Sequence, residues 1–310
     1  MSSSKNFLQP RLIKLPSDPD HALSVAYEAG TPNTPLIVFM NGLMLPSSSF
    51  MPAIEQFVEI IKSEQEEYRQ PGILLWDRYG QGLSQKQEKT HDAYDVIETL
   101  QELLTYISNP KDSIQRPIIF VANSIGCPLT RMYAEKYPSS VVQAMLFLDS
   151  MMASSDFVSI FNEPEDEKEA SKLLPEEREG MRIAREKMLA IFHPSVPNQE
   201  GFDRSHLPQQ LPKSDQLKLK SEPFLTVLGH DHAFFAADTE EKLGIPAFVV
   251  DKYMNAEWDK YNLGLLTLTN PDHARGPIRP KNASHFIQVS NPDIVAQEMY
   301  LLYKKVQRHE

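Results

Sequence analysis

The chain has 310 residues, of which 41% are apolar and 24% charged, and its formal net charge is −11. This composition is that of a soluble globular protein, and the length suffices for one large α/β core or for a core with an inserted cap. The negative charge would repel phosphate backbones and anionic lipid, so neither nucleic acid nor a membrane surface is an expected partner.

The first residues, Met-Ser-Ser-Ser-Lys-Asn, lack the basic-then-apolar pattern of a secretory signal. No apolar run reaches the ~18 residues that a membrane span needs. We therefore expect a cytoplasmic protein. The only cysteine, Cys127, excludes an intrachain disulfide and a cysteine-based metal cluster.

Short apolar runs alternate with helical patterns along most of the chain. Residues 96–107 have apolar side chains at helical spacing, and a closing helix is predicted from Asn291 and Pro292 to Val306. Strands are predicted at residues 11–15, 22–28, 35–40, 72–76, 117–121, 144–148 and 224–228. This alternation is typical of an α/β protein with a mostly parallel, doubly wound sheet covered on both faces.

Residues 151–220 break this rhythm. They contain an acidic run at 163–167 and one helical pattern with apolar side chains from Met181 to Phe192, but no strand pattern. We expect this segment to be a helical cap (lid) inserted into a core domain made of residues 1–150 and 221–310. Its methionine and phenylalanine side chains indicate an apolar pocket roof, with ordinary core packing as the alternative.

The strand at residues 117–121 leads into Ala122-Asn123-Ser124-Ile125-Gly126 and then into a helical pattern. A serine hydroxyl is a poor nucleophile unless a sharp strand-to-helix turn presents it beside a base. Such a turn needs small residues two positions to either side, and Ala122 and Gly126 have minimal side chains. Ser124 is therefore the candidate nucleophile, and a serine that merely caps a helix is the alternative.

Taken together, four separated segments resemble the α/β-hydrolase fold. They are Asn41-Gly42-Leu43 in place of the family's His-Gly turn, Asp77–Ser84 as D-x-x-G-x-G-x-S, the turn at Ser124, and Ser284–Gln288 before the last helix. The chain departs from the family pattern at Ala122, where a glycine is usual, and at Asn41, where a histidine is usual. The resemblance implies an α/β-hydrolase-type sheet with an inserted helical cap.

The resemblance also implies a catalytic triad in the order serine, acid, histidine. His285 is the expected base. Asp231 follows the strand at 224–228, where the family most often places the acid, and we favour it. Asp149 is its rival, because some members draw the acid from the end of the preceding strand, and Asp251 is a third candidate. Each of the two leading aspartates has a turn-forming role as its alternative.

Two backbone N–H groups, those of Leu43 and Ile125, are implied as the oxyanion hole. His230, Asp231 and His232 could instead bind a metal ion. However, alternating residues of an extended segment point to opposite faces, and no third histidine lies at a recognisable ligand spacing. Neither a metal ion nor a cofactor is therefore expected.

These features predict a serine hydrolase that attacks an ester, thioester, lactone or amide bond of a small, largely apolar substrate through an acyl-enzyme, as a carboxylesterase, lactonase or thioesterase does. Serine instead of aspartate at the turn argues against the dehalogenase and epoxide-hydrolase branches. The alternative is a non-hydrolytic member of the fold, such as a ligand receptor, a carbon–carbon lyase or a cofactor-free oxygenase. The expected partner is a small-molecule substrate, and association into a homo-oligomer stays open.

Overall fold

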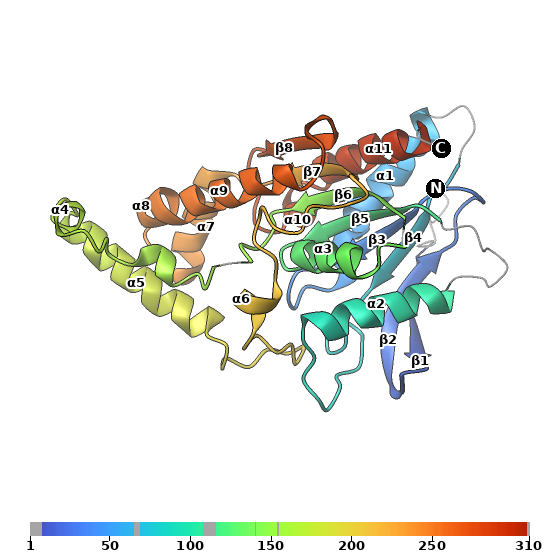
Figure 1. Ribbon diagram of the computed structural model, residues 1–310, viewed down its shortest axis with the longest axis horizontal. Coiled ribbons are helices and arrows are strands. Elements are labelled where there is room, and N and C mark those ends of the chain that lie inside the picture. The colour runs from blue at the N-terminus through green and yellow to red at the C-terminus, as the bar shows by residue number, and fades with distance from the viewer. Residues whose placement is uncertain (1–7, 65–68, 108–115, 140, 154, 309–310) are drawn as a thin grey trace, which may run out of the picture.

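The computed structural model describes residues 8–64, 69–107, 116–139, 141–153 and 155–308. At its centre lies an eight-stranded sheet with the strand order β1-β2-β4-β3-β5-β6-β7-β8 (Figure 1). β2 pairs antiparallel with both β1 and β4, and all other neighbouring strands are parallel. The strands are β1 (Arg11–Leu15), β2 (Asp18–Glu28), β3 (Leu36–Met40), β4 (Gly72–Trp76), β5 (Ile118–Asn123), β6 (Val142–Leu148), β7 (Phe224–Leu228) and β8 (Ala274–Ile278). The mostly parallel sheet confirms the predicted fold class.

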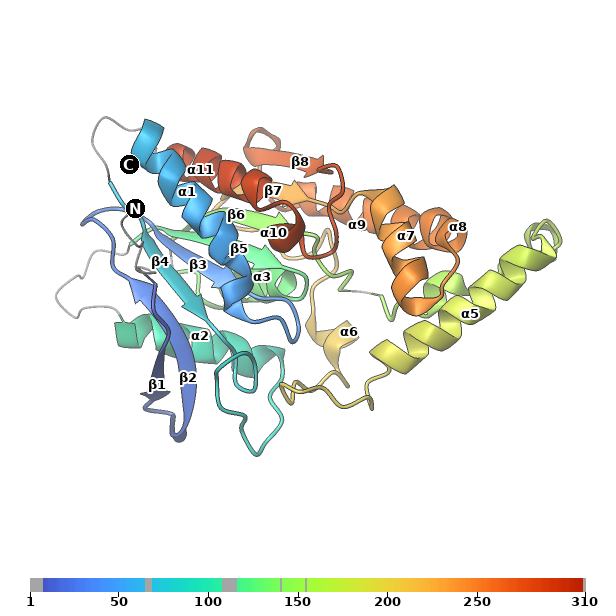
Figure 2. The same ribbon diagram turned by 180° about the vertical axis from the view of Figure 1, so that it is seen from behind.

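Strands β3, β4, β5 and β7 are buried along their whole length because helices cover both faces of the sheet. In β3, Ile37 and Phe39 belong to one buried cluster, whereas Val38 and Met40 belong to the other. The covering helices are α1 (Met51–Glu64) and α11 (Pro292–Arg308) on one face, and α2 (Ala93–Ile107) and α3 (Gly126–Lys136) on the other. Figures 1 and 2 show these two layers from opposite sides.

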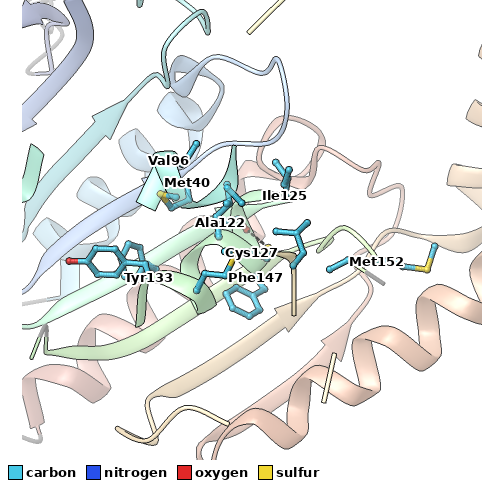
Figure 3. Packing of buried hydrophobic residues seen from close by; sticks show 14 of the residues in the cluster. Met40, Val96, Ala122, Ile125, Cys127, Tyr133, Phe147 and Met152 are labelled. Carbon is cyan, nitrogen blue, oxygen red and sulfur yellow. Dashed lines mark hydrogen bonds between the residues drawn. The ribbon is translucent and has the colours of Figure 1, made fainter. Parts of the chain in front are cut away.

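The cluster between the sheet and helices α2 and α3 lies directly under the turn that follows β5. Ala122, Cys127 and Phe147 are fully buried in it and lie close together (Figure 3). Burial raises the pKa of the Cys127 thiol far above its ordinary value. Cys127 is therefore an inert part of the core that supports the turn.

Between β6 and β7, the described residues form helices and loops without a ladder strand, as the sequence predicts. The helical elements are η2 (Ser159–Phe161), α4 (Glu167–Ala170), α5 (Pro175–Phe192) and α6 (Leu207–Gln210). One isolated bridge joins Phe202 of this segment to His91 of the loop before α2.

A second helical segment lies between β7 and β8 and was not predicted. It consists of α7 (His232–Leu243), α8 (Ala247–Val249), the π-helical turn η3 (Val250–Asn255), α9 (Ala256–Leu265) and the 3₁₀ turns η4 (Leu266–Leu268) and η5 (Pro271–His273). Helix α5 packs against α8 so closely that a Cβ at Gly180 would lie 2.5 Å from Cγ2 of Val249. Both views show α5, α7 and α8 together at the end of the molecule remote from β1 and β2.

The chain closes with the predicted amphipathic helix α11, which follows the short helix α10 (Ile287–Ser290). Val295, Met299, Leu302 and Val306 form its buried stripe against the sheet. Among the described helices, none combines the length and the apolarity that crossing a bilayer requires.

Candidate active site

Ser124 lies at a sharp turn between β5 and α3. Its φ of 55° is in the left-handed region, which costs energy for a residue with a side chain and is typical of a nucleophile held on a strained turn. Helix α3 begins at Gly126, where an added Cβ would lie 2.2 Å from the carbonyl oxygen of Met40. A side chain larger than hydrogen is therefore excluded at Gly126, whereas Ala122 is accommodated in the core.

His285, the expected base, lies beside this serine. Its Nε2 is 3.0 Å from the Oγ of Ser124. The imidazole belongs to the loop between β8 and α10, and the backbone carbonyl of His285 accepts a hydrogen bond from Nδ2 of Asn123. The same amide nitrogen donates to the carbonyl of Leu148 at the end of β6. Asn123, which sequence reasoning passed over, thus ties the histidine loop to the ends of two strands.

The aspartate that contacts His285 is Asp149 and not the favoured Asp231. Nδ1 of His285 lies 2.6 Å from Oδ2 of Asp149. The carboxylate of Asp231 instead caps helix α7, where its Oδ1 accepts from the backbone N–H groups of Ala233 and Phe234. Its other oxygen accepts from the N–H of Asn282.

The preference for Asp231 is therefore corrected by the geometry. Asp231 begins a helix, so the first-turn N–H groups engage its carboxylate. Asp149 follows β6 directly with a φ of 45°, and this turn directs its side chain toward the histidine loop. The third candidate, Asp251, lies in η3 and accepts a hydrogen bond from the amide of Asn255.

Asp149 is fully buried and contacts a second histidine that the sequence analysis considered only as a metal ligand. Nδ1 of His230 lies 2.9 Å from Oδ1 of Asp149. Burial alone would raise the pKa of Asp149, but the attraction of His230 and the hydrogen bonds from His230 and His285 hold that pKa well below its usual range. Asp149 is therefore ionised, as an acid that orients a histidine must be.

The loop after β3 runs against Ser124. A Cβ added at Gly42 would lie 3.4 Å from the Cβ of Ser124 and 2.8 Å from Oδ1 of Asn123. The side chain of Asn41 donates to the carbonyl of Trp76 and to Oε1 of Gln81, so it anchors the loop to the end of β4.

A buried ion pair holds the carbonyl groups of this loop. Arg78 donates from Nη1 to the carbonyl of Asn41 at 2.9 Å and from Nη2 to that of Gly42 at 2.8 Å. Its Nε pairs with Oε2 of Glu200 at 3.0 Å, and the two side chains are 3% and 0% exposed. Oε1 of Glu200 also accepts from the backbone N–H of Met44. Glu200 belongs to the segment between β6 and β7, so that segment contacts the loop directly.

A series of aromatic ring contacts connects the segment between β6 and β7 to His285. Trp258 of α9 lies edge-on to His285 at 5.6 Å between ring centroids. Phe157 is 5.9 Å from Trp258, and Phe192 at the end of α5 stacks on Phe157 at 4.5 Å. Phe157 and Met188, which lies one turn before Phe192 in α5, are both buried, whereas Phe192 is 37% exposed.

A cavity of about 530 Å³ lies elsewhere, between β2, the loop after β4 and α2. Asp18, His21, Tyr79 and His91 are among the residues that line it, whereas Ser124 and His285 are not. This cavity is therefore separate from the site at Ser124.

Residues 37–298 match the family model described as the Alpha/beta hydrolase family. A search of curated proteins finds no match. Similar solved structures include a thermophilic esterase from Thermogutta terrifontis with malate bound, with 15% identity, coverage of 96% of this chain and 99% of that chain, and a TM-score of 0.55.

Carboxylesterase CesB from Bacillus subtilis is also similar, with 11% identity, coverage of 94% of this chain and 90% of that chain, and a TM-score of 0.55. An AqdC variant in complex with its substrate, which recognises and ring-cleaves the Pseudomonas quinolone signal, has 13% identity, coverage of 96% and 100%, and a TM-score of 0.57. At such identities these likenesses show the fold alone. The family model spans most of the chain, and the protein belongs to the α/β-hydrolase family.

Proposed function

We propose that the protein is a serine hydrolase that cleaves an ester, thioester, lactone or amide bond of a small, largely apolar substrate. The observation that carries this proposal is the continuous series of contacts from Ser124 through His285 to Asp149, with distances of 3.0 and 2.6 Å, at a strained strand-to-helix turn. A serine, a base and a buried acid in this geometry are the parts that acyl transfer requires.

In the proposed reaction, the Oγ of Ser124 attacks the substrate carbonyl while Nε2 of His285 takes the hydroxyl proton. The carbonyl π electrons move to its oxygen, and Asp149 stabilises the resulting imidazolium. Collapse of the tetrahedral intermediate breaks the bond to the leaving group, which receives the proton from His285 and leaves an acyl-enzyme. Water, deprotonated by His285, then hydrolyses the acyl-enzyme and regenerates Ser124.

The N–H groups of Leu43 and Ile125 are proposed to stabilise the oxyanion. The carbonyl of Gly42 accepts from both Arg78 and Gln81, which fixes the peptide plane between Gly42 and Leu43. In a trans peptide the N–H points opposite to the carbonyl, so the N–H of Leu43 points away from Arg78. Such an immobilised donor is the kind that supplies electrostatic stabilisation without reorganisation.

The preference for an apolar substrate is supported by side chains next to the proposed catalytic groups. Met44, beside Leu43, and Phe286, beside His285, are 53% and 40% exposed. Trp258 and Phe157 add aromatic surface near the imidazole of His285. Exposed apolar groups around one site are typical of a binding surface for apolar ligands.

We also propose that residues 151–220 act as the cap of this site. Phe157 reaches Trp258 beside His285, and Glu200 contacts the loop at Met44. Two points of this segment therefore lie near the two loops that contact Ser124.

The test compares the wild type with Ser124→Ala in the hydrolysis of p-nitrophenyl esters of increasing acyl length. We expect Ser124→Ala to lose ~10³-fold or more in kcat and to keep the wild-type unfolding temperature, because the hydroxyl contributes little packing. Ser49→Ala, at a serine outside the proposed triad, is the matched control and should retain activity. Undiminished turnover by Ser124→Ala would refute the mechanism, and absence of turnover by the wild type on every ester and thioester would favour a non-hydrolytic role.

A further inference from the structure

Asp149 is shared by two histidines, although the proposed reaction uses only one. Oδ2 lies 2.6 Å from Nδ1 of His285, and Oδ1 lies 2.9 Å from Nδ1 of His230 and 3.2 Å from the backbone N–H of His230. The carboxylate is ionised and can only accept hydrogen bonds, so Nδ1 of His230 must carry a proton.

The other ring nitrogen of His230 faces a second acceptor. Its Nε2 lies 3.0 Å from Oδ1 of Asn255. The orientation of this amide is fixed by its other end, because Nδ2 of Asn255 donates to the carbonyl of His232 and to Oδ1 of Asp251. An amide oxygen has no proton to donate, so Nε2 of His230 must also carry one.

We propose that His230 is a stable imidazolium that pairs with Asp149 and acts as a positioning residue, holding the carboxylate and opposing proton uptake by His285 at low pH. The consequence for catalysis rests on the proposed function, whereas the charge of His230 does not. Two donated hydrogen bonds, one to a carboxylate and one to an oriented amide oxygen, are the geometric basis.

The surroundings of His230 favour the cation despite its burial. Burial by itself lowers the pKa of His230, but the attraction of Asp149 and the hydrogen bonds to Asp149 and Asn255 outweigh it, and the pKa is raised. The ring of Phe235 stacks on the imidazole at 4.1 Å, and Trp258 lies edge-on at 5.1 Å. Stacking on an aromatic face adds a cation–π attraction.

The other charged and titratable groups around His230 come from four elements. His285 lies in the loop before α10, His232 begins α7, Asp251 lies in η3 and Asp259 lies in α9. Asp259 also raises the pKa of His230, and it pairs with His232 and with Arg279. Apart from Asp149, the aspartates therefore have partners of their own, and Asp149 is the anion in direct contact with His230.

The charge balance explains the expected effect on catalysis. With a neutral residue at position 230, proton uptake by His285 would give a site with one negative and one positive charge. With the His230 imidazolium present, the same uptake leaves one net positive charge in a largely buried cluster. Proton uptake is then less favourable, so activity persists to lower pH.

The charge of His230 is measured by ¹⁵N and ¹³C NMR of the histidine rings in the full-length Ser124→Ala variant, with His230→Asn used to assign the signal. We expect both nitrogens of His230 to be protonated at pH 7.5, where a free histidine is mostly neutral. A His230 ring that is neutral at pH 7.5, or that titrates near 6.5, would overturn the proposal. This readout needs no turnover, so it decides the charge of His230 even if the protein is not a hydrolase.

The catalytic consequence is measured by the pH dependence of kcat/KM for an ester. Asn at position 230 keeps an amide donor near Asp149 without the charge, so His230→Asn should move the acidic limb of the profile upward by about one pH unit. His232→Asn, which removes a neighbouring histidine paired with Asp259, is the matched control and should leave the limb in place. An unmoved limb in His230→Asn, with folding intact by circular dichroism, would refute the influence of His230 on His285.

Discussion

Two buried charged clusters lie near Ser124, and they differ in where their hydrogen bonds end. At the ends of β3 and β4, all of the guanidinium nitrogens of Arg78 donate to backbone carbonyls or to Glu200. At the ends of β6 and β7, Asp149 is likewise saturated by two histidines, but Nε2 of His285 is directed at the hydroxyl of Ser124. The first cluster holds the backbone in place, whereas the second ends on the hydroxyl of the proposed nucleophile.

The comparison shows that burial of an ion pair does not by itself identify a catalytic group. Arg78 and Glu200 are as buried as Asp149. Their hydrogen bonds are made to each other and to backbone groups of the loop after β3, so we assign them a positioning role. Substitutions in the two clusters should therefore affect activity and stability in different proportions.

The largest expected effect is on the acid of the proposed triad. Asp149→Asn should lower kcat by ~10³–10⁴-fold, because an amide in this position favours the wrong tautomer of His285. Asp231→Asn should retain most activity, since asparagine also caps a helix well. Steady-state kinetics of both variants check this ranking, and the opposite ranking would restore Asp231 as the acid.

The Arg78–Glu200 pair should show mainly a stability effect. Glu200→Gln leaves the Arg78 guanidinium without its counter-charge in the interior, and we expect a loss of about 3–5 kcal/mol in the free energy of unfolding. Replacement of both residues by leucine should recover much of this stability but not full activity, because the Gly42–Leu43 peptide loses the hydrogen bond from Arg78 and keeps only that from Gln81. A fully lost oxyanion donor is worth ~10²-fold or more in kcat, which sets the upper end of the expected effect.

Urea unfolding measures the stability of these variants, and esterase kinetics measure their kcat. The exposed pair of Lys62 and Glu59 is the control, and Glu59→Gln should leave the unfolding midpoint unchanged. If the double leucine variant had wild-type kcat, the proposed positioning role of Arg78 would be wrong.

A smaller effect is expected from the aromatic rings of the proposed cap. Phe157→Leu and Phe192→Leu should shift the preference among acyl lengths, because a pocket wall contributes about 1–3 kcal/mol per methylene-sized contact to discrimination. Met188→Leu, one turn before Phe192 in α5 and outside the series of aromatic rings, is the matched control. The measurement is kcat/KM as a function of acyl length. An unchanged length preference in both phenylalanine variants would show that these side chains do not line the substrate pocket.

The smallest expected effect is a pH dependence of stability from the Asp149–His230 pair. The pKa of Asp149 is lowered, so its contribution is present above its unfolded value near 3.8 and is lost as the pH falls through the folded value. The pKa of His230 is raised, so its contribution is full below its unfolded value near 6.5 and is lost as the pH rises through the folded value.

The pair should therefore stabilise most between about pH 4 and 6.5. His230→Asn should cost more stability at pH 5.5 than at pH 9, by roughly 1 kcal/mol, as measured by urea unfolding at both pH values. An equal loss at the two pH values would show that His230 contributes by packing alone.

Seven of the eight strands could be predicted from the sequence, and in β3, β4, β5, β6 and β7 the signal was an apolar run that the sheet buries. β8 escaped prediction because Arg275, Gly276 and Pro277 interrupt any such run at the sheet edge. Helix α1 was also not predicted, although its buried residues have helical spacing.

Residues of the candidate site could be predicted where a local sequence pattern marks them. They could not be predicted where their role depends on contacts with residues distant in the sequence. Ser124 and His285 lie in local patterns, whereas the choice between Asp149 and Asp231 depends on which carboxylate a helix N-terminus engages. The N-cap pattern from Asp231 into His232–Leu243 was the signal that could have decided it. Arg78 and Glu200 are 122 positions apart, and no sequence pattern joins them.

The central claim, that Ser124 is a nucleophile activated by His285 and Asp149, is tested most directly by covalent labelling with a fluorophosphonate and mass spectrometry of the labelled peptides. We predict a single phosphonyl group on Ser124 in the wild type, the same group at a similar rate in Asp231→Asn, and strongly slowed labelling in Asp149→Asn and His285→Ala. Labelling at another residue, or an unlabelled Ser124 in the folded wild-type protein, would contradict the account.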